Sequence, residues 1–258
     1  MKPSDPPDPN VTVEVRQLHK AFRGEDVLKG LSFDVAAGEI FAIMGPSGSG
    51  KSVLLRHIIG LEKPDRGEIL IQGESISTPH IRDKFRMAMV FQSGALLTSL
   101  TVAENVGIYL TEHQLHPADE IARIVSDKLE AVGLKGEEER MPNELSGGMQ
   151  KRVAIARALV MDPQLVLFDE PTSELDPMMT VAVGAEILKL NQRTRATTIV
   201  VTHDRNVAFR LARRVAMLSD GELLCVGTPD ELQRHPDPRI QKFIHAEIPD
   251  VHSVTQTR

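Results

Sequence analysis

The chain has 258 residues and a mass of 28.4 kDa, which suits one large α/β domain or two small ones. Its formal net charge of -6 argues against general attraction to nucleic acid or to an anionic membrane. Aromatic residues make up only 3%, which disfavours binding by base stacking. The single cysteine, Cys225, excludes an internal disulfide and a thiolate zinc cluster, and it fits a reducing compartment.

The two ends of the chain are expected to lie outside the folded domain. Residues 1–10, MKPSDPPDPN, are rich in proline and aspartate and predict a disordered leader. Residues 246–258 are expected to form a flexible tail, which leaves residues 11–245 for the domain. No apolar run approaches the roughly 18 residues that a membrane-spanning helix needs, so any work at a membrane requires a partner protein.

Apolar strand patterns alternate with amphipathic helix patterns along the chain. Strands are predicted near 11–17, 30–35, 40–45, 68–73, 86–91, 164–169, 197–202, 214–218 and 222–226. Helices are predicted after Gly50 and near 102–110, 118–132, 147–161, 178–194, 204–212 and 229–235. This alternation favours an α/β fold with a parallel sheet between helices. The early strands predict an antiparallel flap, and the segment near 95–160, in which only helix patterns occur, predicts a helical subdomain inserted in the domain.

A phosphate-binding loop follows the apolar strand pattern IFAIM. The motif GPSGSGKS comprises Gly45, Pro46, Ser47, Gly48, Ser49, Gly50, Lys51 and Ser52. Glycines allow successive backbone N–H groups to point toward phosphate, and the start of a helix adds positive potential. Lys51 would reach the β- and γ-phosphates, and the Ser52 hydroxyl would complete a Mg²⁺ shell. The spacing and context predict nucleotide binding.

Two adjacent carboxylates, Asp169 and Glu170, end the buried strand pattern LVLF. Open α/β sheets bind ligands at this end of their strands. A lone aspartate here would most simply cap a turn, but two acids suggest a division of labour. Asp169 would hold Mg²⁺ directly or through water, and Glu170 would deprotonate the attacking water.

A third motif, LSGGMQ, precedes the helix pattern KRVAIARALVM. Ser146 is a good N-cap, and Gly147 and Gly148 permit close backbone approach. Taken alone, the motif is most simply a capped helix start. In the order GPSGSGKS, LSGGMQ, LVLFDE and a histidine after TIVVT, however, the sequence resembles the nucleotide-binding subunit of ABC transporters from about residue 11 to 245. The resemblance implies a P-loop NTPase with a RecA-like core that binds and hydrolyses ATP with Mg²⁺.

The resemblance also implies roles for residues that their own context leaves open. Gln92 matches the glutamine that senses Mg²⁺ and the membrane partner, and His203 matches the histidine that contacts the γ-phosphate. Asp176 matches an aspartate at the dimer seam, and Phe22 matches the aromatic residue that stacks on adenine. In this family, ATP lies between the phosphate loop of one subunit and the signature of another. The resemblance therefore implies a second copy of the chain as partner.

The segment FQSGALLTSLTVAENVGIYLTEHQ narrows the resemblance to the ATPases of Mla/MCE-type phospholipid transporters. This subgroup implies permease subunits in the membrane, an MCE-domain lipid-binding protein, no nucleic acid partner, and a cytoplasmic location at the inner membrane through the permease. Two departures weaken the assignment to this subgroup but not the assignment as an ATPase. LLTS replaces a more usual Phe-Asp pair, and SELD replaces AGLD.

Three alternatives remain open at this point. The chain could serve an importer of amino acids or metals. It could be a soluble ABC ATPase of repair or translation, although it has neither the long coiled-coil insert of the former nor the second cassette of the latter. It could be a nucleotide kinase, which would leave LSGGMQ and Gln92 without a role.

Overall fold

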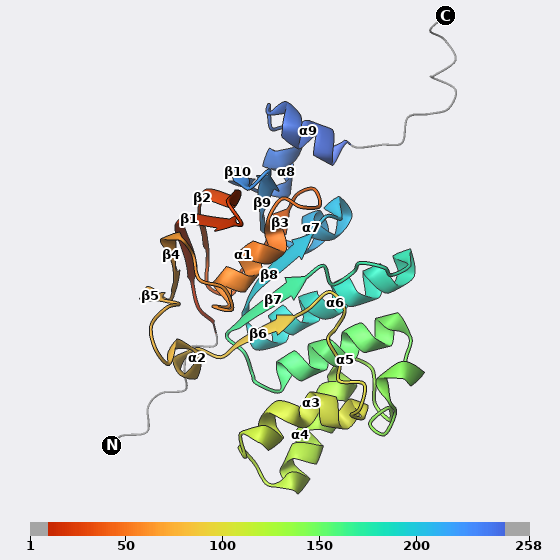
Figure 1. Cartoon of the computed structure of the whole chain (residues 1–258). Helices are drawn as coiled ribbons and strands as arrows, with labels where there is room; N and C mark the ends of the chain where they lie inside the picture. Colours follow the sequence, from red (N-terminus) through yellow and green to blue (C-terminus); the bar gives the residue numbers. More distant parts are fainter. Residues whose placement is uncertain (1–9, 246–258) are drawn as a thin grey trace, which may run out of the picture.

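The computed structural model describes residues 10–245, so the tail at 246–258 and all but the last residue of the predicted leader lie outside the described residues. The two β-sheets lie side by side, and a group of helices lies below them in the view of Figure 1. This arrangement confirms the predicted fold class, a P-loop α/β domain with an antiparallel flap.

The larger sheet has the strand order β10-β9-β3-β8-β7-β6. Strands β9, β3, β8, β7 and β6 are parallel, and β10 joins the edge in the antiparallel direction. Three central strands are buried along their whole length, as their uninterrupted apolar sequences predict. The strands are β3 (Ile40–Met44), β6 (Met87–Val90), β7 (Leu165–Asp169), β8 (Thr197–Thr202), β9 (Arg214–Ser219) and β10 (Glu222–Gly227).

The smaller sheet is antiparallel, with the order β2-β1-β4-β5. Its strands are β1 (Val13–Phe22), β2 (Glu25–Val35), β4 (Arg66–Ile71) and β5 (Glu74–Ser75). A backbone hydrogen bond of 2.9 Å from Lys29 to the carbonyl of Gly221 ties β2 to the turn before β10. The half-buried Cys225 lies on β10, and burial raises the pKa of its thiol.

The helices of the chain occupy two regions. Helices α3, α4 and α5 pack on one another at one end of the molecule, beside α6 (Figure 1). The bounds are α1 (Lys51–Ile58), α2 (Ile81–Lys84), α3 (Val102–Glu112), α4 (Ala118–Ala131), α5 (Gly147–Leu159), α6 (Pro177–Thr194), α7 (Arg205–Leu211), α8 (Pro229–Gln233) and α9 (Pro238–Ile244), with a 3-10 turn at Pro142–Glu144.

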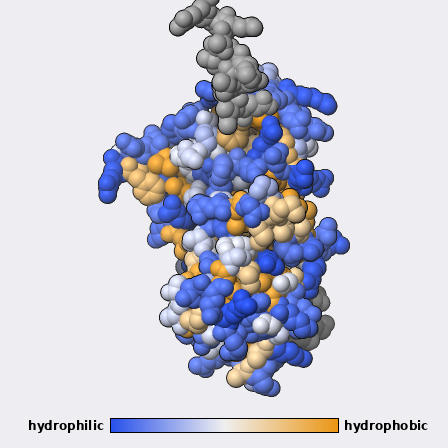
Figure 2. All heavy atoms as spheres, turned by 90° about the vertical axis from the view of Figure 1, so that its right-hand side faces the viewer, coloured by the Kyte–Doolittle hydropathy of each residue, from blue (hydrophilic) through white to orange (hydrophobic). Residues whose placement is uncertain are grey.

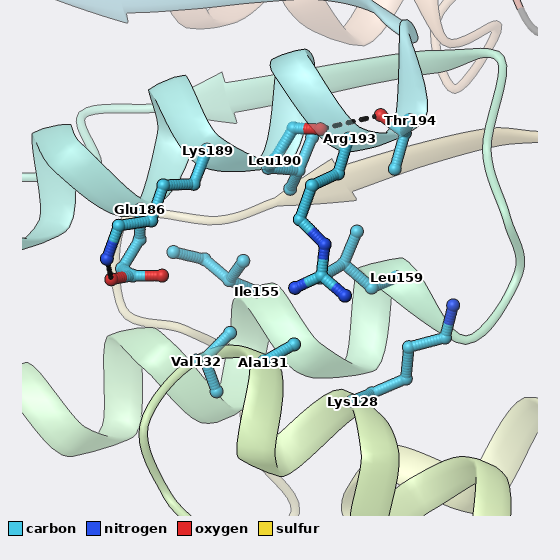
Figure 3. Close-up of a pocket in the computed structure, with 10 residues that line it drawn as sticks. All are labelled: Lys128, Ala131, Val132, Ile155, Leu159, Glu186, Lys189, Leu190, Arg193 and Thr194. Atoms are coloured by element: carbon cyan, nitrogen blue, oxygen red, sulfur yellow. Dashed lines mark hydrogen bonds and ion pairs between the residues drawn. The ribbon is translucent and has the colours of Figure 1, made fainter.

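Two apolar clusters join these layers. One lies between the antiparallel sheet, α1 and one face of the larger sheet, and it includes Leu18, Phe41 and Leu54. The other lies on the opposite face and includes Val106, Ile155 and Phe168, so the helices near 102–159 share a core with the sheet. A small hollow of about 60 Å³ remains where α4, α5 and α6 meet, with Lys128 and Arg193 at its edge (Figure 3).

Each predicted strand and helix is present, but some bounds differ. β1 and β2 are longer than predicted, because they form one hairpin through the turn at 23–24. The short elements β5, α2 and α9 were not predicted from the sequence. Within residues 10–245, every helix is too short or too polar to traverse a lipid bilayer.

We predict that Leu18→Ala lowers the free energy of unfolding by about 2–5 kcal/mol, the usual cost of a buried cavity of this kind. Leu18 is fully buried between the two sheets. Urea unfolding monitored by circular dichroism gives the value. The half-exposed Leu61 is the control, and Leu61→Ala should change stability by no more than about 0.5 kcal/mol. Equal losses in the two variants would contradict a core shared by the sheets.

Candidate functional site

The phosphate loop leaves the end of β3, which lies in the middle of the larger sheet, and enters α1 (Figure 1). Gly50 has a φ of 96°, a value that favours glycine, and it caps the start of α1. At Gly45, an added Cβ would lie 2.1 Å from the carbonyl oxygen of Leu218. The loop therefore requires glycine at these two positions for different reasons, one conformational and one steric.

Lys51 is held inside this loop. Its side chain is only 7% exposed, and Nζ donates to the carbonyls of Gly45 at 2.8 Å and Pro46 at 2.9 Å. Burial lowers the pKa of the ammonium group, while the charges of Glu170 and Asp169 act in the opposite direction. A buried cation without an ion pair in the described part of the chain favours an anionic ligand.

Asp169, the last residue of β7, reaches the phosphate loop from two strands away. The Ser52 hydroxyl donates to Oδ1 of Asp169 at 2.9 Å. Burial raises the pKa of Asp169 and the neighbouring Glu170 raises it further, whereas the Ser52 hydrogen bond lowers it. The structure thus brings together the hydroxyl and the carboxylate that the sequence predicts for Mg²⁺.

Glu170 follows in a left-handed backbone conformation, with a φ of 47° that is costly for a residue with a side chain. Its Oε2 lies 2.9 Å from Nδ1 of His203 and 3.3 Å from the His203 backbone nitrogen. Because an ionised carboxylate only accepts hydrogen bonds, Nδ1 carries the proton. This contact fixes one carboxylate oxygen and leaves the other available to the cleft.

Lys51, Ser52, Glu170 and His203 line one open cleft of about 320 Å³, a size in the range of small-molecule sites, whereas Asp169 lies behind Ser52 outside the lining. Its walls include Lys51, Gln92, Glu170 and His203, and Val27 of β2 closes one side. The pairing of the flap with the sheet brings Val27 to the cleft, and no sequence motif marks this residue. The hollow shown in Figure 3 is about 60 Å³, too small for a nucleotide.

The residues predicted from the signature and from the dimer seam lie elsewhere in the chain. Ser146 caps α5 by accepting from the Met149 nitrogen at 3.3 Å, and Asp176 caps α6 by accepting from Met179 at 2.9 Å. Neither they nor Gly147 and Gly148 line the cleft. The Met179 methyl group occupies the position that a Cβ at Gly148 would need.

Phe22 also lies outside the lining of the cleft. It ends β1, is 42% exposed, and has the Lys20 Nζ 5.1 Å from its ring centroid. The exposed ring can stack on a flat ligand, and adenine stacking by Phe22 stays a prediction.

The donor set near the phosphate loop fits a nucleotide with a bound Mg²⁺. The buried Ser49 hydroxyl makes no hydrogen bond within the described chain, so the loop retains capacity for phosphate oxygen. Residues 10–245 contain no group of three His, Cys, Asp or Glu side chains that could form a complete metal cage. A Mg²⁺ site built from one hydroxyl, one carboxylate and substrate phosphates needs no such cage.

Comparison with known proteins agrees with this geometry. Residues 28–173 match the family described as ABC transporter. The intermembrane phospholipid transport system ATP-binding protein MlaF of Escherichia coli K12 is 41% identical, over 90% of this chain and 88% of its own. The probable ribonucleotide transport ATP-binding protein mkl of Mycobacterium leprae is 38% identical, over 91% of this chain and 69% of its own. A dimeric ATP-binding cassette in a post-hydrolysis state, bound to ADP and Pi, matches with a TM-score of 0.77 and 34% identity, over 84% of this chain and 98% of that chain.

This chain belongs to the ABC transporter family. As an ABC transporter domain it binds ATP and hydrolyses it, and hydrolysis is coupled to transport. Membership confirms the resemblance and excludes the nucleotide kinase. The roles of single residues stay predictions, for which the contacts above supply the geometry.

We predict that Asp169→Asn stabilises this ABC transporter domain when no nucleotide is bound. A raised pKa means that the folded state binds the Asp169 proton more tightly than the unfolded state, so ionisation at neutral pH costs stability. At pH 8 the melting temperature should rise by about 2–4 °C, the shift that about 1 kcal/mol produces in a domain of this size.

The gain should shrink as the pH falls through the pKa of Asp169, because the wild-type carboxyl then takes up its own proton. Differential scanning fluorimetry from pH 4 to pH 8 measures the trend. A variant that is less stable than the wild type at pH 8 would contradict the cost inferred for an ionised Asp169 at this buried position beside Glu170.

Proposed function

We propose that the chain powers a lipid transporter as one half of a head-to-tail pair of identical subunits. ATP would lie between the phosphate loop (residues 45–52) of one copy and the signature (residues 145–150) of the other. The observation that carries the proposal is the separation of these motifs within one chain: the cleft contains the phosphate loop, Gln92, Glu170 and His203, but not the signature. A second chain is needed to supply it.

In this arrangement, Lys51 and the N-terminus of α1 would bind the phosphates, and Ser146 with Gly147 and Gly148 would approach the γ-phosphate from the partner copy. Ser52, Asp169 and Gln92 would hold Mg²⁺, which neutralises phosphate charge when bound. Phe22 would stack on adenine, and Asp176 would lie at the seam between the copies.

Glu170 would act as the general base for the attacking water. His203 fixes its Oε2 through two N–H groups, so the free oxygen can accept a hydrogen bond from water and then its proton. His203 would also contact the γ-phosphate through its second ring nitrogen. ATP would bring the copies together by joining two incomplete half-sites, and hydrolysis would release them.

The surface near the signature suits transient association. Figure 2 looks onto the side where one end of α6 lies, and it shows separate hydrophobic patches on a mainly hydrophilic surface. Met178, at the start of α6, is 79% exposed, and Val181 is also exposed. Contact between two copies would cover these side chains next to Asp176.

We predict that Glu170→Gln forms a stable dimer with ATP and Mg²⁺, because it retains ATP binding but lacks the base. Analytical ultracentrifugation should show the dimer, and phosphate release should fall at least about 100-fold, the usual weight of a general base. Adding Ser146→Arg in the same chain should abolish the dimer without preventing ATP binding.

The matched control is Lys51→Ala in the Glu170→Gln background, which should lose both ATP binding and the dimer. A dimer that persists with Ser146→Arg would contradict the head-to-tail arrangement. Normal steady-state hydrolysis by Glu170→Gln would remove Glu170 as the base.

We infer phospholipid or another lipid as the cargo, since the intermembrane phospholipid transport protein MlaF matches 90% of this chain at 41% identity. The proposed partners are permease subunits in the inner membrane and an MCE-domain lipid-binding protein, with the ATPase on the cytoplasmic side. The ribonucleotide transport protein mkl, at 38% identity, supports nucleotides as the second candidate.

We predict that the tagged chain, purified from detergent-solubilised native membranes, carries a permease and an MCE-domain protein. Mass spectrometry would identify the proteins, and lipid analysis would detect co-purified phospholipid. The tag alone is the control. A permease with a soluble amino acid, metal or nucleotide receptor, and without an MCE-domain protein, would overturn the lipid proposal.

A further inference from the structure

The segment 92–95, which follows β6 and includes Gln92, lies directly on helix α5. Gly94 is buried, and a Cβ at this position would lie 3.6 Å from the Cβ of Ala154 and 3.6 Å from the carbonyl oxygen of Gln150. Gly94 and Ala95 both have positive φ angles, of 72° and 46°. The segment is therefore a sharply turned strap against α5 rather than an extended linker.

Two cations of α5 bind the backbone of this strap. The Lys151 ammonium donates to the carbonyl of Gln92. The Arg157 guanidinium donates through Nη1 to the carbonyl of Ala95 at 2.7 Å and through Nη2 to that of Gly94 at 2.6 Å. Three of the four carbonyls of residues 92–95 thus accept from the helix that begins at the signature.

Removing these two cations from water costs free energy, so we expect their contacts to have a specific role. Lys151 is 9% exposed, and neither cation has a carboxylate within ion-pair distance among the described residues. Burial lowers the pKa of both groups, although Glu174, Glu170 and Asp169 favour the charged form of Lys151. Hydrogen bonds from a buried cation are strong and directional, so the accepting carbonyls are held firmly.

Arg152, another cation of α5, has different partners. Its Nη1 donates to the carbonyls of Val132 and Gly133, at 3.2 and 3.3 Å, and ties α5 to the end of α4. Arg152 contacts no atom of the strap in these hydrogen bonds. It therefore serves as a matched control on the same helix.

We propose that Lys151 and Arg157 are positioning residues that make the strap 92–95 move as one body with the signature helix α5. They would thereby set the position of Gln92 at the wall of the nucleotide cleft. The kinetic part of this proposal rests on the proposed Mg²⁺ contact of Gln92.

We predict that Lys151→Met frees the strap without unfolding α5. Hydrogen–deuterium exchange of the nucleotide-free protein should be roughly 10-fold faster at residues 92–96 and unchanged in the second half of α5, because only a local contact is lost. Lys151→Gln retains a neutral donor and should give an intermediate effect. Lys151→Arg should restore protection, and Arg152→Met should leave residues 92–96 unchanged.

The same variants separate positioning from simple destabilisation in ATPase assays. Lys151→Met should raise the Mg²⁺ concentration for half-maximal ATPase activity and lower kcat by roughly 10-fold, as loss of an outer-shell partner does. ATP affinity without Mg²⁺ should stay the same, and Lys151→Arg should rescue kcat. Arg152→Met should keep kcat within about twofold of the wild type.

Two outcomes would overturn the inference, and they differ from failure of the Gln92 assignment. Exchange that rises equally in Lys151→Met and Arg152→Met, or that rises throughout α5, would show a general structural role. Unchanged exchange at 92–96 in Lys151→Met would show that Lys151 does not hold the strap. By contrast, unaltered Mg²⁺ dependence in Gln92→Ala would contradict only the metal role of Gln92. The exchange measurements would still decide whether Lys151 holds the strap.

Discussion

Two adjacent carboxylates at the end of a buried strand impose the main constraint on this structure. Asp169 and Glu170 are each 9% exposed, so their charges repel each other with little screening by water. Different neighbours offset the repulsion: the Ser52 hydroxyl binds one carboxylate and His203 binds the other. The two carboxylates are thus held by different partners, which distinguishes the proposed metal-holding group from the proposed base.

Two lysines on different helices are near these carboxylates, and both bind backbone carbonyls instead of acids. Lys51 of α1 holds the phosphate loop, and Lys151 of α5 holds the strap after β6. The carboxylates at the end of β7 raise the pKa of both lysines, against the lowering by burial, although neither lysine forms an ion pair with them. One cation, Lys51, thus lines the cleft, and the other, Lys151, holds the strap from α5 outside the lining.

The sequence predicts the parts of this site that depend on local chain order. The apolar run at 40–44 followed by glycines, and the run at 165–168 followed by two acids, predict their strands correctly, and the parallel sheet places both motifs at the same edge. β5 and α2 have two and four residues, too few for a hydrophobic period to be visible. Val27 and Lys151 depend on sheet register and on the packing of α5, which no local pattern encodes. A lysine on the buried side of a helix was the only available signal for Lys151.

The lone thiol has a practical consequence for following motion in this molecule. Cys225 is half-buried on β10, and its raised pKa keeps the thiolate scarce near neutral pH. Alkylating dyes and spin labels therefore react slowly at this position, whereas a cysteine introduced on an exposed loop reacts readily. The sequence therefore provides a nearly silent background for site-specific labelling, so spectroscopy can follow labels on the strap 92–95 and on α5 without removal of Cys225.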